Sequence, residues 1–189
     1  MTTVSCIRTA ALKPRARAFA DYWLSLPRTD LIPYRRDFEP GALAGILNTF
    51  LIFEIVAPDH FLVRLAGTTV IEHYGREITG QNYLDFRTPQ ERSITRAAMT
   101  LIATHPCGQL VSQAVRTGDG KGRISESFGL PMRDDAGRAT LLYYQVDDIR
   151  LDDFKTREER YLLEKKTAIR HFIDIGNGIP DFPHVGTLS

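Results

Sequence analysis

Three strand-like segments that follow one another with only short turns between them constrain this fold most. They cover residues 108–116, 122–132 and 138–147. The glycine-rich turn TGDGK joins the first two, and RDDAG lies between the second and the third. Strands joined by such short turns must run antiparallel, because a parallel pairing needs a crossover of about a dozen residues or more. The sequence therefore predicts a three-stranded antiparallel meander, in which TGDGK is a hairpin turn rather than a phosphate-binding loop.

Another hairpin is predicted earlier in the chain. NTFLIFEIV, residues 48–56, is short and rich in β-branched and aromatic side chains, which is typical of a buried strand. FLVRLA, residues 61–66, places Phe61, Val63 and Leu65 on one face by period-two alternation. Only the turn APDH separates the two segments, so they pair antiparallel. The predicted fold class is α+β, with one five-stranded antiparallel sheet.

The link between the two hairpins contains the central helices. After a short helix comes a longer one, which begins at the capping box formed by Thr88 and Glu91, has Pro89 in its first turn, and ends near His105. This link has to cross one face of the sheet. We therefore expect the central helices to cover that face and to enclose a space between themselves and the strands.

Two further helices are predicted at the ends of the chain. Residues 14–26 carry one apolar stripe, which must be buried against this domain or against a second copy: Phe19, Tyr22, Trp23 and Leu26. A terminal helix is expected to begin at Asp152 or Asp153 and to end at Gly176. Its apolar face is formed by Leu162, Ile169 and Ile173. Acidic residues precede basic ones on its charged face, as suits the helix dipole.

Composition excludes several classes of protein. The chain has 189 residues, of which 43% are hydrophobic and 25% charged, the balance of an ordinary globular domain. Its formal net charge of +1 gives no indication of a nucleic-acid partner or a membrane surface. Two cysteines, Cys6 and Cys107, are too few for a disulfide framework and fit a reducing compartment. With no signal-peptide pattern and no apolar run of roughly 20 residues, we expect a cytoplasmic protein.

Several separated motifs resemble a PAS domain. RLAGTTVIEHYGREITGQNYLDF is similar to the PAS core, in which a strand runs into a short helix and then a segment with paired glycines, here Gly75 and Gly80. GLPMRDDAGRATLLYYQVDDI resembles the PAS hairpin of strands four and five. PYRRDFEP, FLIFEI and LPMRDDAG add a similarity to small single-domain bacterial PAS proteins, best known from alphaproteobacteria. The resemblance covers roughly residues 23–146.

This resemblance implies a sheet of order 2-1-5-4-3, with a pocket between the sheet and the central helices. It implies a core over residues 48–150, with flanking helices in 1–47 and a helix and tail in 151–189. It also implies a non-catalytic sensory or signalling domain that binds a small molecule or a partner protein and forms a homodimer. Fold alone does not fix the ligand, the partner or the direction of the signal.

Residues expected to line the pocket come from both layers. They are Leu65, Val70, Ile71, Tyr74, Ile94, Ala98, Leu101, Glu126, Phe128 and Tyr143. His73 is expected at the surface, because the apolar stripe of the short helix turns it partly away. Glu126 stands among apolar neighbours on its strand face. It is either a partly buried carboxylate paired with Arg64 or a ligand, or an acid at the exposed strand margin.

Two rival functions follow from individual residues. An enzyme would use Glu126, with a pKa raised by burial, together with His73 or Tyr74 for acid–base chemistry. A haem or flavin sensor would need a suitable ligand or cysteine. The long helix offers only His105 at its end, followed by Cys107, and a histidine there also suits a helix terminus. GQNYLDF lacks the cysteine that covalent flavin photochemistry requires, and the five histidines are too scattered to predict a metal site.

Overall fold

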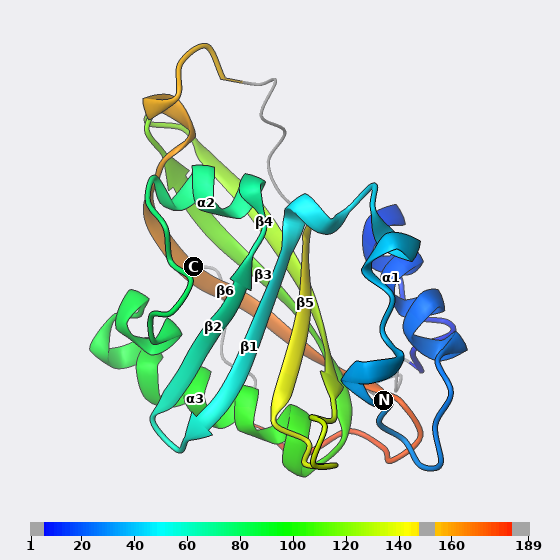
Figure 1. Cartoon of the computed structure of the whole chain (residues 1–189). Helices are drawn as coiled ribbons and strands as arrows, with labels where there is room; N and C mark the ends of the chain where they lie inside the picture. Colours follow the sequence, from blue (N-terminus) through cyan, green and yellow to red (C-terminus); the bar gives the residue numbers. More distant parts are fainter. Residues whose placement is uncertain (1–5, 148–153, 183–189) are drawn as a thin grey trace.

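The computed structural model describes residues 6–147 and 154–182. One six-stranded sheet forms the centre of the molecule, and its strand order is β2-β1-β5-β4-β3-β6 (Figure 1). All its neighbouring strands pair antiparallel. The strands are β1 Phe50–Ala57, β2 His60–Ala66, β3 Cys107–Thr117, β4 Gly122–Met132, β5 Leu141–Asp147 and β6 Leu162–Asp174. The predicted order 2-1-5-4-3 is confirmed, and a sixth strand extends it at β3.

The prediction of a terminal helix was wrong, because Leu162–Asp174 forms β6. This strand pairs along the whole of β3, from Cys107 opposite Asp174 to Thr117 opposite Leu162. Without it, β3 would be an edge strand with unpaired N–H and C=O groups. A register shift opposite Ser112 and Gln113 breaks the period-two alternation of β6. The spacing of its apolar residues is therefore similar to that of a helix. The predicted start of that helix lies outside the described residues.

Helices cover both faces of the sheet. Helix α1, Pro14–Ser25, lies on one face (Figure 1). The central helices α2, Thr68–Tyr74, and α3, Pro89–Thr104, lie on the other with the short 3-10 helix η4, Tyr83–Phe86. Further 3-10 turns are η1 Arg35–Asp37, η2 Pro40–Leu43, η3 Leu47–Thr49 and η6 Glu158–Arg160.

The face beneath α1 has an aromatic core. Phe19 and Trp23 of α1 are completely buried. The ring of Phe19 makes edge contacts with Phe50 at 5.0 Å and with Phe128 at 5.9 Å between centroids. The indole N–H of Trp23 donates to the carbonyl oxygen of Pro131 at 3.0 Å. The apolar stripe of this helix therefore packs on its own sheet.

The face beneath α3 has a separate core around α2, α3 and the outer strands. As predicted, Thr88 caps α3, and its hydroxyl accepts from the backbone N–H of Glu91 at 3.3 Å. The buried face of α3 consists of Thr95, Ala98, Met99 and Ile102. Of the predicted stripe Ile94, Ala98 and Leu101, only Ala98 is fully buried, because the helix is rotated by about one residue from that expectation.

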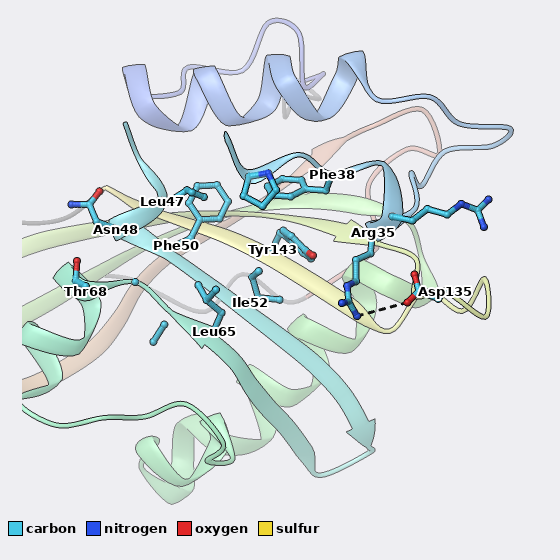
Figure 2. A pocket seen from close by; sticks show the side chains of 14 residues that line it. Arg35, Phe38, Leu47, Asn48, Phe50, Ile52, Leu65, Thr68, Asp135 and Tyr143 are labelled. Atoms are coloured by element: carbon cyan, nitrogen blue, oxygen red, sulfur yellow. Dashed lines mark ion pairs between the residues drawn. The ribbon is translucent and has the colours of Figure 1, made fainter. Parts of the chain in front are cut away.

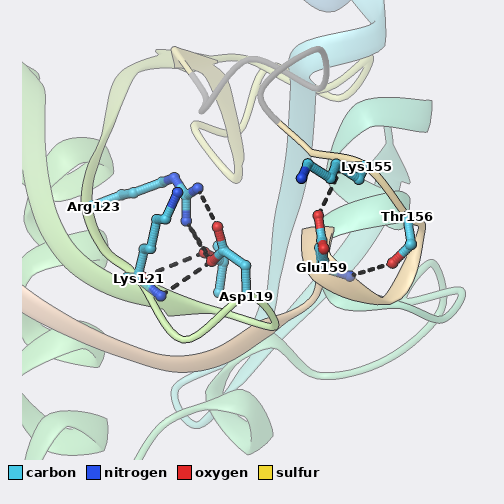
Figure 3. Close-up of polar contacts among 7 residues, drawn as sticks. Asp119, Lys121, Arg123, Lys155, Thr156 and Glu159 are labelled. Atoms are coloured by element: carbon cyan, nitrogen blue, oxygen red, sulfur yellow. Dashed lines mark hydrogen bonds and ion pairs between the residues drawn. The ribbon is translucent and has the colours of Figure 1, made fainter.

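The turn between β3 and β4 is a hairpin turn, as predicted, and it has a polar network. Asp119 accepts from Arg123 at 2.6 Å and from the backbone N–H of Lys121 at 3.1 Å (Figure 3). Gly118 lies so close to the segment before β6 that a Cβ atom would come within 2.0 Å of the carbonyl oxygen of Glu158. This contact requires glycine and brings the chain entering β6 against the end of the hairpin.

Candidate ligand-binding cavity

A small cavity lies between the sheet and the η4–α3 segment, where the resemblance implied a pocket. Its volume is about 30 Å³, and every strand except β2 contributes to its lining. Part of the lining is apolar, including Phe53, Met99 and Val111. Five charged, amide or aliphatic hydroxyl side chains of the lining are buried, which is unusual for the interior of a domain this small: Arg87, Thr95, Gln109, Gln113 and Arg170.

Three buried polar side chains of the lining come from β3 and β5. The hydroxyl of Tyr144 donates to the side-chain oxygen of Gln109 at 2.8 Å, and both residues are buried. Burial raises the pKa of Tyr144 well above its ordinary value, so the hydroxyl stays protonated at neutral pH. The amide nitrogen of Gln109 is buried and has no hydrogen-bond partner in the described part of the chain. Gln113, on the same face of β3, is also buried.

Two arginines complete the cavity from opposite sides. Arg87 follows η4 and is 8% exposed, and Arg170 lies on β6 and is 6% exposed. The guanidinium of Arg87 donates to the Tyr83 hydroxyl and lies over that ring, 4.7 Å from its centroid. Burial is the main cause that lowers the pKa of Arg170, and the positive charge of Arg87 adds to it.

The local sequence explains how these two side chains reach the cavity. Arg87 immediately precedes Thr88, the N-cap of α3, and its backbone N–H donates to the carbonyl of Leu84. Arg170 lies opposite Val111 in the β3–β6 ladder and shares its face of the sheet. Because residues 162–174 were predicted to form a helix, Arg170 was not predicted to line the cavity. A strand interpretation that included the bulge would have found it.

A second hollow, of about 790 Å³, lies on the α1 side of β1 and β2 (Figure 2). Phe38, Ile52, Leu65 and Tyr143 form its apolar walls. At its rim, Arg35 forms an ion pair with Asp135 at 3.9 Å. We call this hollow the outer groove.

None of the ten residues predicted to line the pocket lines the inner cavity. Leu65 and Tyr143 line the outer groove. Phe128 belongs to the core beneath α1, whereas Val70 and Ala98 are buried beneath the central helices. The remaining predicted residues Ile71, Tyr74, Ile94 and Leu101 are half-buried. The physical reason is strand parity: on β5 the cavity side is formed by Tyr144 and Val146, so Tyr143 points to the opposite face.

Glu126 also points toward α1. Its carboxylate forms an ion pair with Lys13 at 2.5 Å, and Lys13 approaches Asp147 at 3.5 Å. Burial acts to lower the pKa of Lys13, but the hydrogen bond and charge of Glu126 outweigh it and raise that pKa overall. Arg64, expected as a partner, instead pairs with Glu54.

The structure does not bring the residues of the enzyme hypothesis together. Glu126 lies on the face covered by α1, whereas His73 and Tyr74 belong to α2 on the other face. His73 is 1% exposed, so its predicted surface position was wrong. Phe154, from the segment before β6, covers it with a ring contact of 6.4 Å between centroids. Sequence reasoning missed this contact because it assigned that segment to the terminal helix.

The residues considered for haem have other surroundings. His105 is the C-cap residue of α3, and its backbone N–H donates to the carbonyl of Leu101 at 2.8 Å. Cys107 is buried, and burial raises the pKa of its thiol to about 12. That thiol is neutral at physiological pH, whereas metals bind the thiolate. In the described ranges, no three His, Cys, Asp or Glu side chains are grouped so that they could hold a metal ion. No helix of the described part is long and apolar enough to span a membrane.

Comparison with known proteins identifies the family of this chain. Among solved structures, the chain is similar to the light state of the blue-light photoreceptor Aureochrome1 LOV, at 19% identity over 59% of this chain and 89% of that one, with a TM-score of 0.41. The dark state of that photoreceptor gives 19% identity, 68% and 90% coverage, and a TM-score of 0.43. No curated protein matches significantly. A family model described as a PAS domain matches residues 12–143. The chain therefore belongs to the PAS domain family.

Proposed function

We propose that this protein is a non-catalytic, cytoplasmic sensory PAS domain that binds a small molecule in the inner cavity and signals through a partner protein. The observation that carries the proposal is the buried polar lining around Gln109, Arg87 and Arg170. Apolar side chains of similar volume would stabilise the fold better than unpartnered polar groups. Polar groups that converge on a cavity are what orients a small ligand in a binding site.

The placement of β6 suggests how binding would be transmitted. Lys165, Thr167 and Arg170 of this strand line the cavity opposite residues from η4 and α3. A ligand that contacts both sides would link β6 to the helical layer. Because β6 is the last strand of the sheet, its pairing with β3 can change without disturbing the five other strands. We propose that a partner protein recognises the position of this strand.

Native mass spectrometry of the freshly purified protein tests ligand binding. We expect an additional mass that is lost on denaturation, and thermal stabilisation when the identified compound is added back. An absorbance spectrum of the same sample tests a haem or flavin cofactor, and we expect neither a Soret band nor a flavin band. Absence of any bound compound, together with no stabilisation by a metabolite library, would contradict ligand sensing.

We also propose that the domain forms a homodimer. Leu65 is 42% exposed on the wall of the apolar outer groove, which a second copy can cover. Size-exclusion chromatography with light scattering is expected to give twice the monomer mass of 21.3 kDa. Replacement of Leu65 by glutamate should shift the protein to monomer. A strict monomer at high concentration would remove this part of the proposal.

A further inference from the structure

The residues that line the inner cavity include buried hydrogen-bond donors without a partner in the described part of the chain. The Nε and Nη1 atoms of both Arg87 and Arg170 are buried and have no hydrogen-bond partner among the residues that the structure describes. The side-chain nitrogen of Gln109 is in the same condition. Arginine does not lose its proton in proteins, so these buried groups stay charged. Leaving a buried charge without a partner is costly, and the site therefore lacks an acceptor.

Two neighbouring groups that carry acceptor oxygens already take part in other hydrogen bonds. Glu91, whose charge acts on Arg170, accepts the backbone N–H of Thr167 at 2.9 Å with one carboxylate oxygen and contacts the Thr88 hydroxyl at 3.3 Å with the other. The hydroxyl of Tyr144 donates to Gln109. The charged side chains in the described lining are Arg87, Lys165 and Arg170, all of them cationic. The potential in the cavity is therefore positive.

We propose that the cavity binds the carboxylate or phosphate group of a small organic anion, held by Arg87 and Arg170 with the amide of Gln109 as a further donor. This inference rests on the proposed sensory function and names its ligand class. The guanidinium fork matches carboxylate and phosphate oxygens in pairs, and such bonds are stronger than neutral ones. Because the two arginines come from the helical layer and from β6, the anion would join these two parts.

The dimensions of the cavity limit what enters it. A volume of about 30 Å³ exceeds the roughly 10–15 Å³ that a cavity needs to hold one water molecule, so the cavity has room for a small head group but not for a larger ligand. Arg87 and Lys165 also line a surface groove of about 900 Å³ between η4, α3 and β6. Tyr74, Phe86 and Leu163 give this groove apolar walls. The ligand is therefore an anion with an apolar or aromatic body that lies in the groove.

Calorimetric titration with matched probes tests the anion. Phenylacetate and phenyl phosphate carry an aromatic body with each head group, phenylacetamide is the neutral counterpart, and inorganic phosphate lacks the body. Ionic strength and chloride are held equal throughout. We expect at least one of the two aromatic anions to bind saturably at concentrations up to about 10 mM, and phenylacetamide to bind at least about tenfold more weakly. The comparison of the two anions decides between a carboxylate and a phosphate.

Three variants separate the cavity from general charge effects. Arg170→Met and Arg87→Met should each weaken binding of the anion at least about tenfold, and Arg170→Lys should restore it only in part, because lysine lacks the fork. Arg96→Met is the control, since Arg96 pairs with Asp59 on the surface of α3 at 2.8 Å. Thermal unfolding of each variant verifies that it is folded.

The outcomes distinguish this inference from the sensory proposal. Binding of phenylacetamide equal to that of the tighter-binding aromatic anion, unchanged binding in Arg170→Met, or no saturable binding of any anionic probe would overturn the anion inference. In those cases a neutral compound found by native mass spectrometry would leave the sensory proposal intact. If no compound co-purifies, no probe binds and no compound of the metabolite library stabilises the protein, both proposals fail.

Discussion

The two faces of the sheet bury different kinds of side chain. Beneath α1, Phe19 and Trp23 pack against aromatic rings of the strands, and the one polar group of Trp23 has a carbonyl partner. Beneath α3, Arg87 and Arg170 are almost as deeply buried, but two nitrogen atoms of each have no partner in the described part of the chain. The first face stabilises the fold. The second retains buried polar groups that cost stability, and the proposed ligand site is on this face.

The largest effect should follow from a change beneath α1. Trp23→Ala leaves a large cavity and removes the hydrogen bond to Pro131, so we expect it to lower the free energy of unfolding by about 3–5 kcal/mol. Urea unfolding followed by circular dichroism measures this. Arg15→Ala, at an exposed position of the same helix, should change stability by no more than about 0.5 kcal/mol. A loss below about 1 kcal/mol for Trp23→Ala would show that this face does not hold the fold.

Beneath α3, one substitution should have the opposite sign. Arg170→Met replaces an incompletely paired buried charge by an apolar side chain of similar length. In anion-free buffer we expect it to raise the free energy of unfolding by about 1 kcal/mol or more. The same urea experiment measures it. A loss of several kcal/mol would mean that the guanidinium stabilises the fold, and the contrast between the two faces would disappear.

A fall in pH should weaken the ion pairs of the turns before it affects the packing on either face of the sheet. Arg123 holds the pKa of Asp119 below its ordinary value of 3.8, and the backbone N–H of Ile32 followed by Arg133 does the same for Asp30. Because the folded pKa values are depressed, this stability is complete above about pH 5 and is lost as the pH falls through them. Unfolding curves measured between neutral pH and about pH 2 should show the loss, and Asp119→Asn should reduce it. A pH-independent stability would contradict these contacts.

The smallest effect is expected for Glu126→Gln. The Lys13–Glu126 pair is partly exposed, so its loss should change the free energy of unfolding by about 1 kcal/mol or less. Anion binding should be unchanged, because Glu126 lies on the face covered by α1. If this substitution abolished binding in the calorimetric titration, the ligand site would have to lie on the α1 side.

Local pattern was sufficient to predict most of this fold. The glycine turns and the alternation of Phe61 and Val63 predicted the hairpins, and the capping box at Thr88 predicted where α3 begins. The prediction that Leu65 shares their face was wrong, because a bulge between β1 and β2 turns Leu65 to the α1 side. The strand order came from resemblance. Local pattern did not show which face of each strand meets which helix. For that reason Tyr143 was predicted to line the pocket, whereas Tyr144 lines it. A shift of one residue moves every side chain of a strand to the opposite face, so the face that is buried is decided by long-range packing.

The missed part of the site has a different cause. Residues 162–174 satisfy a helical repeat as well as a bulged strand, and only the unpaired edge of β3 decides between them. That edge is a tertiary feature and leaves no mark on the local sequence. The error removed Arg170 from consideration and also hid the contact of Phe154 that buries His73. The candidate site could be located from the resemblance, but its charged residues could not.

Nuclear magnetic resonance of the isotopically labelled protein tests the contrast between the two faces most directly. The arginine Nε–H signals of Arg87 and Arg170 report on the inner cavity, and the indole N–H signal of Trp23 reports on the face beneath α1. On titration with phenylacetate or phenyl phosphate, we predict saturable shifts of both arginine signals and an unchanged Trp23 signal. A shift of the Trp23 signal with both arginine signals unmoved would contradict the account.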